Sequence, residues 1–134
     1  MPGEPVADDE VLMRRIPPGS TWFEPPDRLT SANFKLQLKK HELGVSVYRQ
    51  SIVSEVDLLA SPDSIPGSFV VTATAGDVRG LTSGSGEPLR LDVMPADDED
   101  NPGHAEIRGP EPGKLSPSAS KGLRDLFARS LSKG

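Results

Sequence analysis

The chain has 134 residues, the length of a single domain, and a formal net charge of −5, which excludes a general attraction for nucleic acid or for an anionic membrane. It contains no cysteine, so disulfides, thiolate zinc sites and cysteine nucleophiles are excluded. We also expect neither a metal nor a cofactor. The N-terminus is acidic and no apolar run approaches the roughly 20 residues that span a bilayer, so we expect a cytoplasmic protein without a signal peptide or a membrane partner.

Short strands are predicted in the first half of the chain. Residues 11–16 are apolar around two arginines and predict a strand or, as the alternative, one helical turn, which the following Pro-Pro pair ends. Residues 17–33 predict a loop whose two aromatic side chains fold back on the core. Apolar residues alternate within 33–41, and Val-Ser-Val-Tyr-Arg at 45–49 predicts a further strand.

The centre of the chain predicts a helix and then the strongest strand. An amphipathic helix is expected over residues 51–60, with Ser51 or Ser54 as its cap. Its apolar positions at helical spacing are Ile52, Val53, Val56, Leu59 and Ala60. Residues 68–75 are rich in β-branched and aromatic side chains, which predicts a strand.

Turns and strands alternate through the next part of the chain. Residues 76–81 predict a tight turn into one helical turn capped by Asp77, and residues 89–94 alternate as in a half-exposed strand. Asn-Pro-Gly at 101–103 is strong turn chemistry. The alternation after it predicts a strand that begins at His104.

A basic amphipathic helix is predicted at the C-terminus. Apolar residues lie on one helical face and basic residues surround it, so the helix could bind a partner's groove or dock on its own domain. The residues predicted to bind are Leu123, Arg124, Leu126, Phe127 and Leu131.

The predicted fold is a single α+β domain with a small mixed or antiparallel sheet of four to five strands, one packed helix and the C-terminal amphipathic helix. Proline is about twice as frequent as usual, at 14 residues, and clusters at the edges of this domain. The expected segments are a flexible acidic tail at 1–9, the domain at 10–109, a proline-rich linker at 110–117 and the helix at 118–134.

Five polar residues are the catalytic candidates if the protein is an enzyme. His104 and Glu106 share one face of their predicted strand and could form an acid–base pair or only a structural hydrogen bond. Arg14 and Arg15 could clamp a phosphate or carboxylate, or instead form salt bridges with acidic side chains. Tyr48 lies on the strand at 45–49, whose serine lacks a Gly-x-Ser-x-Gly elbow and is interpreted as an ordinary strand residue.

Four short motifs carry a resemblance to a known family. They are Leu-Met-Arg-Arg-Ile-Pro at 12–17, Thr-Ser-Ala-Asn-Phe at 30–34, Gly-Val-Ser-Val-Tyr-Arg at 44–49 and Asn-Pro-Gly-His-Ala-Glu-Ile at 101–107. Their order and spacing resemble a widespread family of small bacterial proteins that has no assigned activity. The resemblance covers residues 10–107 and implies a folded bacterial domain.

A second resemblance is to ADP-ribosyltransferases of the arginine–serine–glutamate type. That family places an arginine on an early strand, a serine on a middle strand and a glutamate on a late one, and Arg14, Ser46 and Glu106 occur in this order. The Ser-Thr-Ser signature is missing, and His104 stands where the family has a second glutamate. This resemblance implies a small enzyme.

Two functions remain open at this point. The first is a non-enzymatic interaction or accessory protein that binds another bacterial protein encoded nearby, with an antitoxin-like or immunity inhibitor, or a subunit of a defence complex, as special cases. The second is a small enzyme acting on a nucleotide or NAD-like substrate. Proline-rich edges, an acidic loop and a separable basic helix favour the first.

Overall fold

The computed structural model describes residues 5–19, 22–24, 28–34, 44–61, 64–96, 102–111 and 114–133. It contains a five-stranded antiparallel sheet in the order β5-β1-β4-β7-β6, which together with the helices confirms the predicted α+β class. The strands of this sheet are β1 (Val11–Ile16), β4 (Val45–Arg49), β5 (Phe69–Thr74), β6 (Asp92–Pro95) and β7 (His104–Arg108). A small second sheet pairs β2 (Phe23–Glu24) with β3 (Arg28–Leu29). The helices are η1 (Ser31–Phe34), α1 (Glu55–Leu59), α2 (Ala75–Arg79), α3 (Pro117–Ala128) and η3 (Arg129–Lys133).

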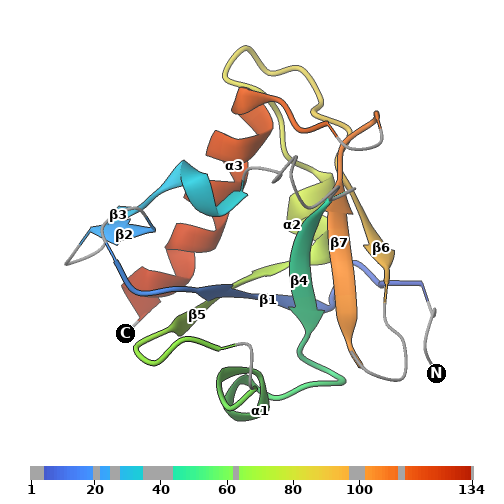
Figure 1. Cartoon of the computed structure of the whole chain (residues 1–134). Coiled ribbons are helices and arrows are strands. Elements are labelled where there is room, and N and C mark those ends of the chain that lie inside the picture. The colour runs from blue at the N-terminus through green and yellow to red at the C-terminus, as the bar shows by residue number, and fades with distance from the viewer. Residues whose placement is uncertain are drawn as a thin grey trace.

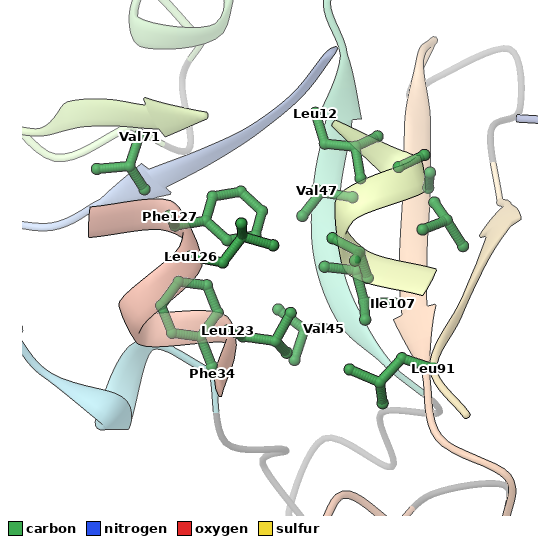
Figure 2. Close-up of a cluster of buried hydrophobic side chains, with 14 of the residues drawn as sticks. Leu12, Phe34, Val45, Val47, Val71, Leu91, Ile107, Leu123, Leu126 and Phe127 are labelled. Atoms are coloured by element: carbon green, nitrogen blue, oxygen red, sulfur yellow. The ribbon is translucent and has the colours of Figure 1, made fainter. Parts of the chain in front are cut away.

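The hydrophobic core lies between one face of the five-stranded sheet and α2, α3 and η1 (Figure 1). α2 follows β5 directly and contacts both β5 and β6, the two edge strands of the sheet. Alternation along the strands turns Leu12, Val47 and Ile107 inward, where all three are fully buried. They face Phe34 and Phe127 across the core (Figure 2). The ring centroids of these two phenylalanines lie 5.2 Å apart.

Two predicted elements differ from the structure because of local backbone geometry. The strand expected over 89–94 begins only at Asp92, since Arg90 has φ +56°, a left-handed conformation that an extended strand does not accommodate. The cap of α2 is Thr74 and not Asp77. The Thr74 hydroxyl accepts the Asp77 N–H at 3.2 Å, which places Asp77 inside the first turn.

The central helix is shorter than predicted and buries a different side chain. α1 starts after the cap Ser54 and ends at Leu59 instead of covering 51–60, because the preceding residues form a separate tight turn. Leu58 is the buried residue of α1, whereas Val56 of the predicted apolar face is 74% exposed. The periodicity therefore predicted a helix correctly but assigned it the wrong inner face.

The segment predicted as a loop over 17–33 contains the β2–β3 sheet and η1. Trp22 and Phe23 pack against the core, which confirms that this segment folds back. Phe23 meets Phe69 of β5 edge to face, with ring centroids 5.0 Å apart. Residues 35–43, which include most of the predicted alternation, lie outside the described part of the chain.

Residues near both ends of the described chain contribute to the core, and α3 docks on its own domain, which is one of the two alternatives left open for this helix. Val6 is buried in the core cluster, and Asp8 accepts a hydrogen bond from Arg79 of α2 at 2.7 Å. At the other end, Leu123 and Phe127 of α3 are fully buried in the same cluster. The apolar face of α3 forms one wall of the core, because the five strands alone leave that side of the sheet open.

Removing residues 112–134 is expected to unfold the domain. The deletion uncovers the core at Leu123 and Phe127, and losing a buried Phe side chain alone costs about 3–5 kcal/mol. That cost is comparable with the roughly 5–15 kcal/mol by which small domains are stable. Urea unfolding followed by circular dichroism measures the effect, with the exposed substitution Lys121→Ala as a control expected to change stability by less than about 0.5 kcal/mol. Cooperative unfolding of the shortened chain would contradict the prediction.

Candidate functional site

The sheet separates the two neighbouring arginines that were candidates for anion binding. Arg14 points to the core face, where Nη1 donates to the Ser46 carbonyl at 2.8 Å and Nη2 to the Asn33 carbonyl at 2.9 Å. Arg15 points to the opposite, outer face, and its Nη1 donates to the Leu58 carbonyl of α1 at 3.1 Å. Each guanidinium binds backbone of a different segment, so the two do not form one anion clamp.

The outer face brings His104 together with Ser46 and Tyr48. His104 stands opposite Tyr48 in the β4–β7 register, with ring centroids 5.5 Å apart. Its Nε2 lies 3.1 Å from Ser46 Oγ, and its Nδ1 lies 3.2 Å from the Ala96 carbonyl. Because a carbonyl only accepts, Nδ1 of the neutral ring carries the proton and Nε2 accepts from the Ser46 hydroxyl.

Glu106 shares this face with His104 but is bound to Arg108. Arg108 Nη2 and Nε donate to Glu106 Oε1 at 2.5 Å and 3.1 Å. Residues two apart on a strand are separated by about 7 Å, which a long arginine side chain bridges more readily than a histidine ring. The histidine's partner is instead Ser46 on the adjacent strand, a contact that depends on the strand register and has no signal in the sequence.

The Ser46–His104 pair has the orientation of a nucleophile and its base. Acyl transfer also requires donors aimed at the oxyanion. The guanidinium groups of Arg14 and Arg15 bind backbone carbonyls instead, and Arg14 lies across the sheet from His104. The catalytic candidates are thus divided between two faces, and we interpret the pair as a cross-strand structural contact.

Ser46→Ala is expected to destabilise the protein by about 1 kcal/mol, because it removes one half-buried hydrogen bond. His104→Ala is expected to cost more, because it also removes the bond to the Ala96 carbonyl. The double variant is expected to lose less than the sum, with a coupling of at least about 0.5 kcal/mol, since the two side chains share that bond. Urea unfolding of the wild type, the two single variants and the double variant measures this coupling energy as a double-mutant cycle. A burst of p-nitrophenolate from p-nitrophenyl acetate that Ser46→Ala abolishes would contradict the structural interpretation.

Three exposed apolar side chains lie in α1 or near it along the chain, and with two carboxylates of the helix they define what we call the α1 surface. Val56 is 74% exposed, Ile65 55% and Ile52 43%. They are three of the four large apolar side chains that are exposed among the described residues. Glu55 and Asp57 are exposed on either side of Val56 in the helix. Single exposed apolar residues are ordinary, whereas exposed apolar residues that form a contiguous patch are typical of interaction sites.

A buried ion pair holds the turn that leads into α1. Arg49 Nε donates to Glu10 Oε1 at 3.0 Å, and the two side chains are 8% and 9% exposed. The Ser51 hydroxyl donates to the same oxygen, and the Ser51 N–H to Glu10 Oε2 at 3.4 Å. The Arg49 carbonyl accepts the N–H groups of Ile52 and Val53 at 3.0 Å and 2.9 Å. Side-chain and backbone bonds therefore fix the start of the α1 surface.

The turn predicted at 101–103 supports the same segment. Gly103 has φ +78°, which favours glycine, and its carbonyl accepts the Arg49 N–H at 2.9 Å. A β-carbon at Gly103 would lie 2.7 Å from Val53 Cγ2, so any larger residue would push the turn and the α1 segment apart. Asn101 of this turn lies outside the described residues.

The pKa of the Glu10 carboxyl lies below its usual range. Burial on its own would raise this pKa, but the hydrogen bonds from Ser51 and Arg49, together with the positive charge of Arg49, outweigh burial. A carboxyl whose pKa is lower in the folded than in the unfolded chain stabilises the fold above the unfolded pKa of about 4.3. That stabilisation is lost as the pH falls through the folded pKa.

Glu10→Gln is expected to destabilise the protein by roughly 3–5 kcal/mol at pH 7, because it removes the negative charge that faces the buried Arg49 guanidinium. The difference between wild type and variant is expected to shrink as the pH falls below the unfolded pKa of about 4.3 and to vanish as the pH falls through the lower folded pKa of the carboxyl. Urea unfolding at a series of pH values tests both statements, with the exposed Glu87→Gln as the control. A difference that stays constant down to acidic pH would show that Glu10 does not act through its charge.

The residues predicted to bind a partner on the C-terminal helix lie in or against the core. Leu123, Leu126 and Phe127 are buried, and the half-buried Leu131 packs against the same cluster. Arg124 is ion-paired with its neighbouring aspartate at 2.9 Å. The apolar face of this helix is thus packed within the domain, and its binding to a partner stays a prediction.

The chain matches no family profile, no curated protein and no solved structure. Its resemblance to a bacterial family therefore stays a prediction. Within the described ranges, no cluster of three or more His, Asp or Glu side chains could hold a metal ion. No helix in that part of the chain is both long and apolar enough to cross a membrane.

Proposed function

We propose that the protein is a non-enzymatic accessory protein that binds another protein through the α1 surface. The observation that carries this proposal is the exposure of Ile52, Val56 and Ile65 in one short segment of a small domain. Removing apolar surface from water is the main favourable contribution to most protein association. These side chains offer that contribution to a partner, because the domain itself leaves them in solvent.

The two edges of the sheet are less suited to a partner, because side chains already occupy hydrogen-bonding groups there. At β6, Arg79 Nη2 donates to the Val93 carbonyl at 3.2 Å, and Asp92 Oδ1 accepts the Val93 N–H at 2.8 Å. At β5, the Thr72 N–H donates to Ser130 Oγ at 3.1 Å. Occupied edge groups discourage the addition of a foreign strand. Recognition through the side chains of the α1 surface does not require unpaired backbone groups at a sheet edge.

The α1 surface is also held in place before any partner arrives. Arg15 reaches from the sheet to the Leu58 carbonyl, and the Ser54 hydroxyl caps the helix by accepting the Asp57 N–H at 3.1 Å. With the Glu10–Arg49 pair, these contacts fix α1 at both ends and from the sheet. A surface ordered in advance loses less conformational entropy on binding, which favours affinity.

The enzymatic alternative has less support from the geometry. A nucleotide or NAD-like substrate would need an arginine and the polar groups of β7 in one pocket. Arg14 and Glu106, two members of the arginine–serine–glutamate order, lie on opposite faces of the sheet. Arg15 shares the outer face with His104, but its guanidinium holds α1.

Photo-crosslinking in the native host tests the proposal. The full-length protein carrying p-benzoylphenylalanine in place of Val56 is expected to form one discrete covalent adduct on illumination, because this side chain would lie in the interface. The same amino acid in place of the exposed Ser85, in a different loop, is the control and is expected to give none. No adduct at position 56, or the same adducts from both positions, would contradict the proposal.

A further inference from the structure

We infer that the partner presents a basic segment with apolar side chains to the α1 surface. This inference rests on the proposed function and adds the chemistry of the partner. Val56 needs apolar side chains opposite it, and the carboxylates of Glu55 and Asp57 need lysine or arginine. An amphipathic helix with one apolar and one basic face supplies both from a single element.

The charges of the α1 surface carry this inference. Glu55 and Asp57 flank the most exposed of the large apolar side chains, and none of the ion pairs between described residues involves either of them. An apolar partner would remove water from these carboxylates without replacing the lost hydrogen bonds. Basic side chains replace those bonds, and the net charge of −5 steers them toward the domain.

Two other occupants fit this surface less well. An anionic lipid surface would be repelled by Glu55 and Asp57, so the exposed Val56 is not a membrane anchor. A second copy of the chain, paired symmetrically through the α1 surface, would place the carboxylates of both copies against each other. A basic segment of another protein meets neither repulsion.

A peptide titration of the full-length protein tests the inference. The probe is a synthetic helical peptide with leucine on one face and lysine on the other, and the readout is the amide NMR spectrum of the labelled protein. Shift changes are expected at residues 52–65. Val56→Ser is expected to weaken binding by roughly tenfold or more, as for a central apolar contact. The variant Glu55→Gln/Asp57→Asn is expected to weaken binding and to reduce its dependence on salt between about 0.05 and 0.3 M.

Matched controls separate local charge from net charge. The variant Asp77→Asn/Glu87→Gln removes the same two charges from exposed carboxylates outside the α1 surface, and it is expected to bind like wild type. A peptide with glutamate in place of lysine is expected not to bind. Because acidic residues also stabilise the first turn of a helix, the amide spectrum of each free variant establishes that α1 is intact.

The inference is overturned if the lysine peptide shifts residues outside 52–65, if the glutamate peptide binds as tightly, or if the control variant weakens binding equally. Its failure is distinguishable from failure of the proposed function. An adduct at position 56 in the host without binding of the lysine peptide leaves the proposed function standing and removes the basic partner. Absence of both the adduct and the binding removes both.

Discussion

The buried ion pair between Arg49 and Glu10 is the interaction on which the outer surface of this domain depends. Arg49 ends β4, donates its N–H to Gly103, accepts the N–H groups of the turn before α1 and reaches Glu10 at the entrance to β1. One residue therefore joins two strands, the turn before β7 and the segment that leads into the helix. A buried ion pair gives little net stability over an apolar pair, but either partner alone is a costly buried charge. Its effect is chiefly geometric, because it holds the turn that leaves β4 against the start of β1.

The polar residues that suggested chemistry mostly satisfy the backbone. Arg14 donates to carbonyls of β4 and η1, and Arg15 donates to a carbonyl of α1. In a small domain with short strands and irregular connections, many carbonyl oxygens have no partner within a ladder, and buried ones require a donor. The guanidinium geometry that suits a phosphate also suits two backbone oxygens. An arginine among apolar residues in a strand is therefore ambiguous until the neighbouring segments are placed.

The sequence predicted what depends on neighbouring residues and missed what depends on distant ones. Apolar and β-branched composition located β1, β4 and β5 closely, and alternation located β7 and placed His104 and Glu106 on one face. It did not pair His104 with Ser46, because the register of β4 against β7 has no local signal. It extended a strand through Arg90, whose left-handed φ the apolar alternation does not encode. The proline-rich segment left open whether the C-terminal helix docks or detaches, and only the placement of the core shows that α3 packs against it.

The largest disagreement concerns α1 and has a physical explanation. Ile52, Val56 and Leu59 are spaced as the buried face of a helix, yet Leu58 is the side chain turned inward. A five-residue helix held by one buried leucine, a serine cap and a bond from Arg15 needs no wider apolar face to stay in place. Local pattern and tertiary structure conflict most often where a surface has a second role. If a partner covers α1, the sequence pattern and the structure no longer conflict. The apolar spacing then predicts side chains that are buried in the complex, and Val56 is exposed only in the free domain.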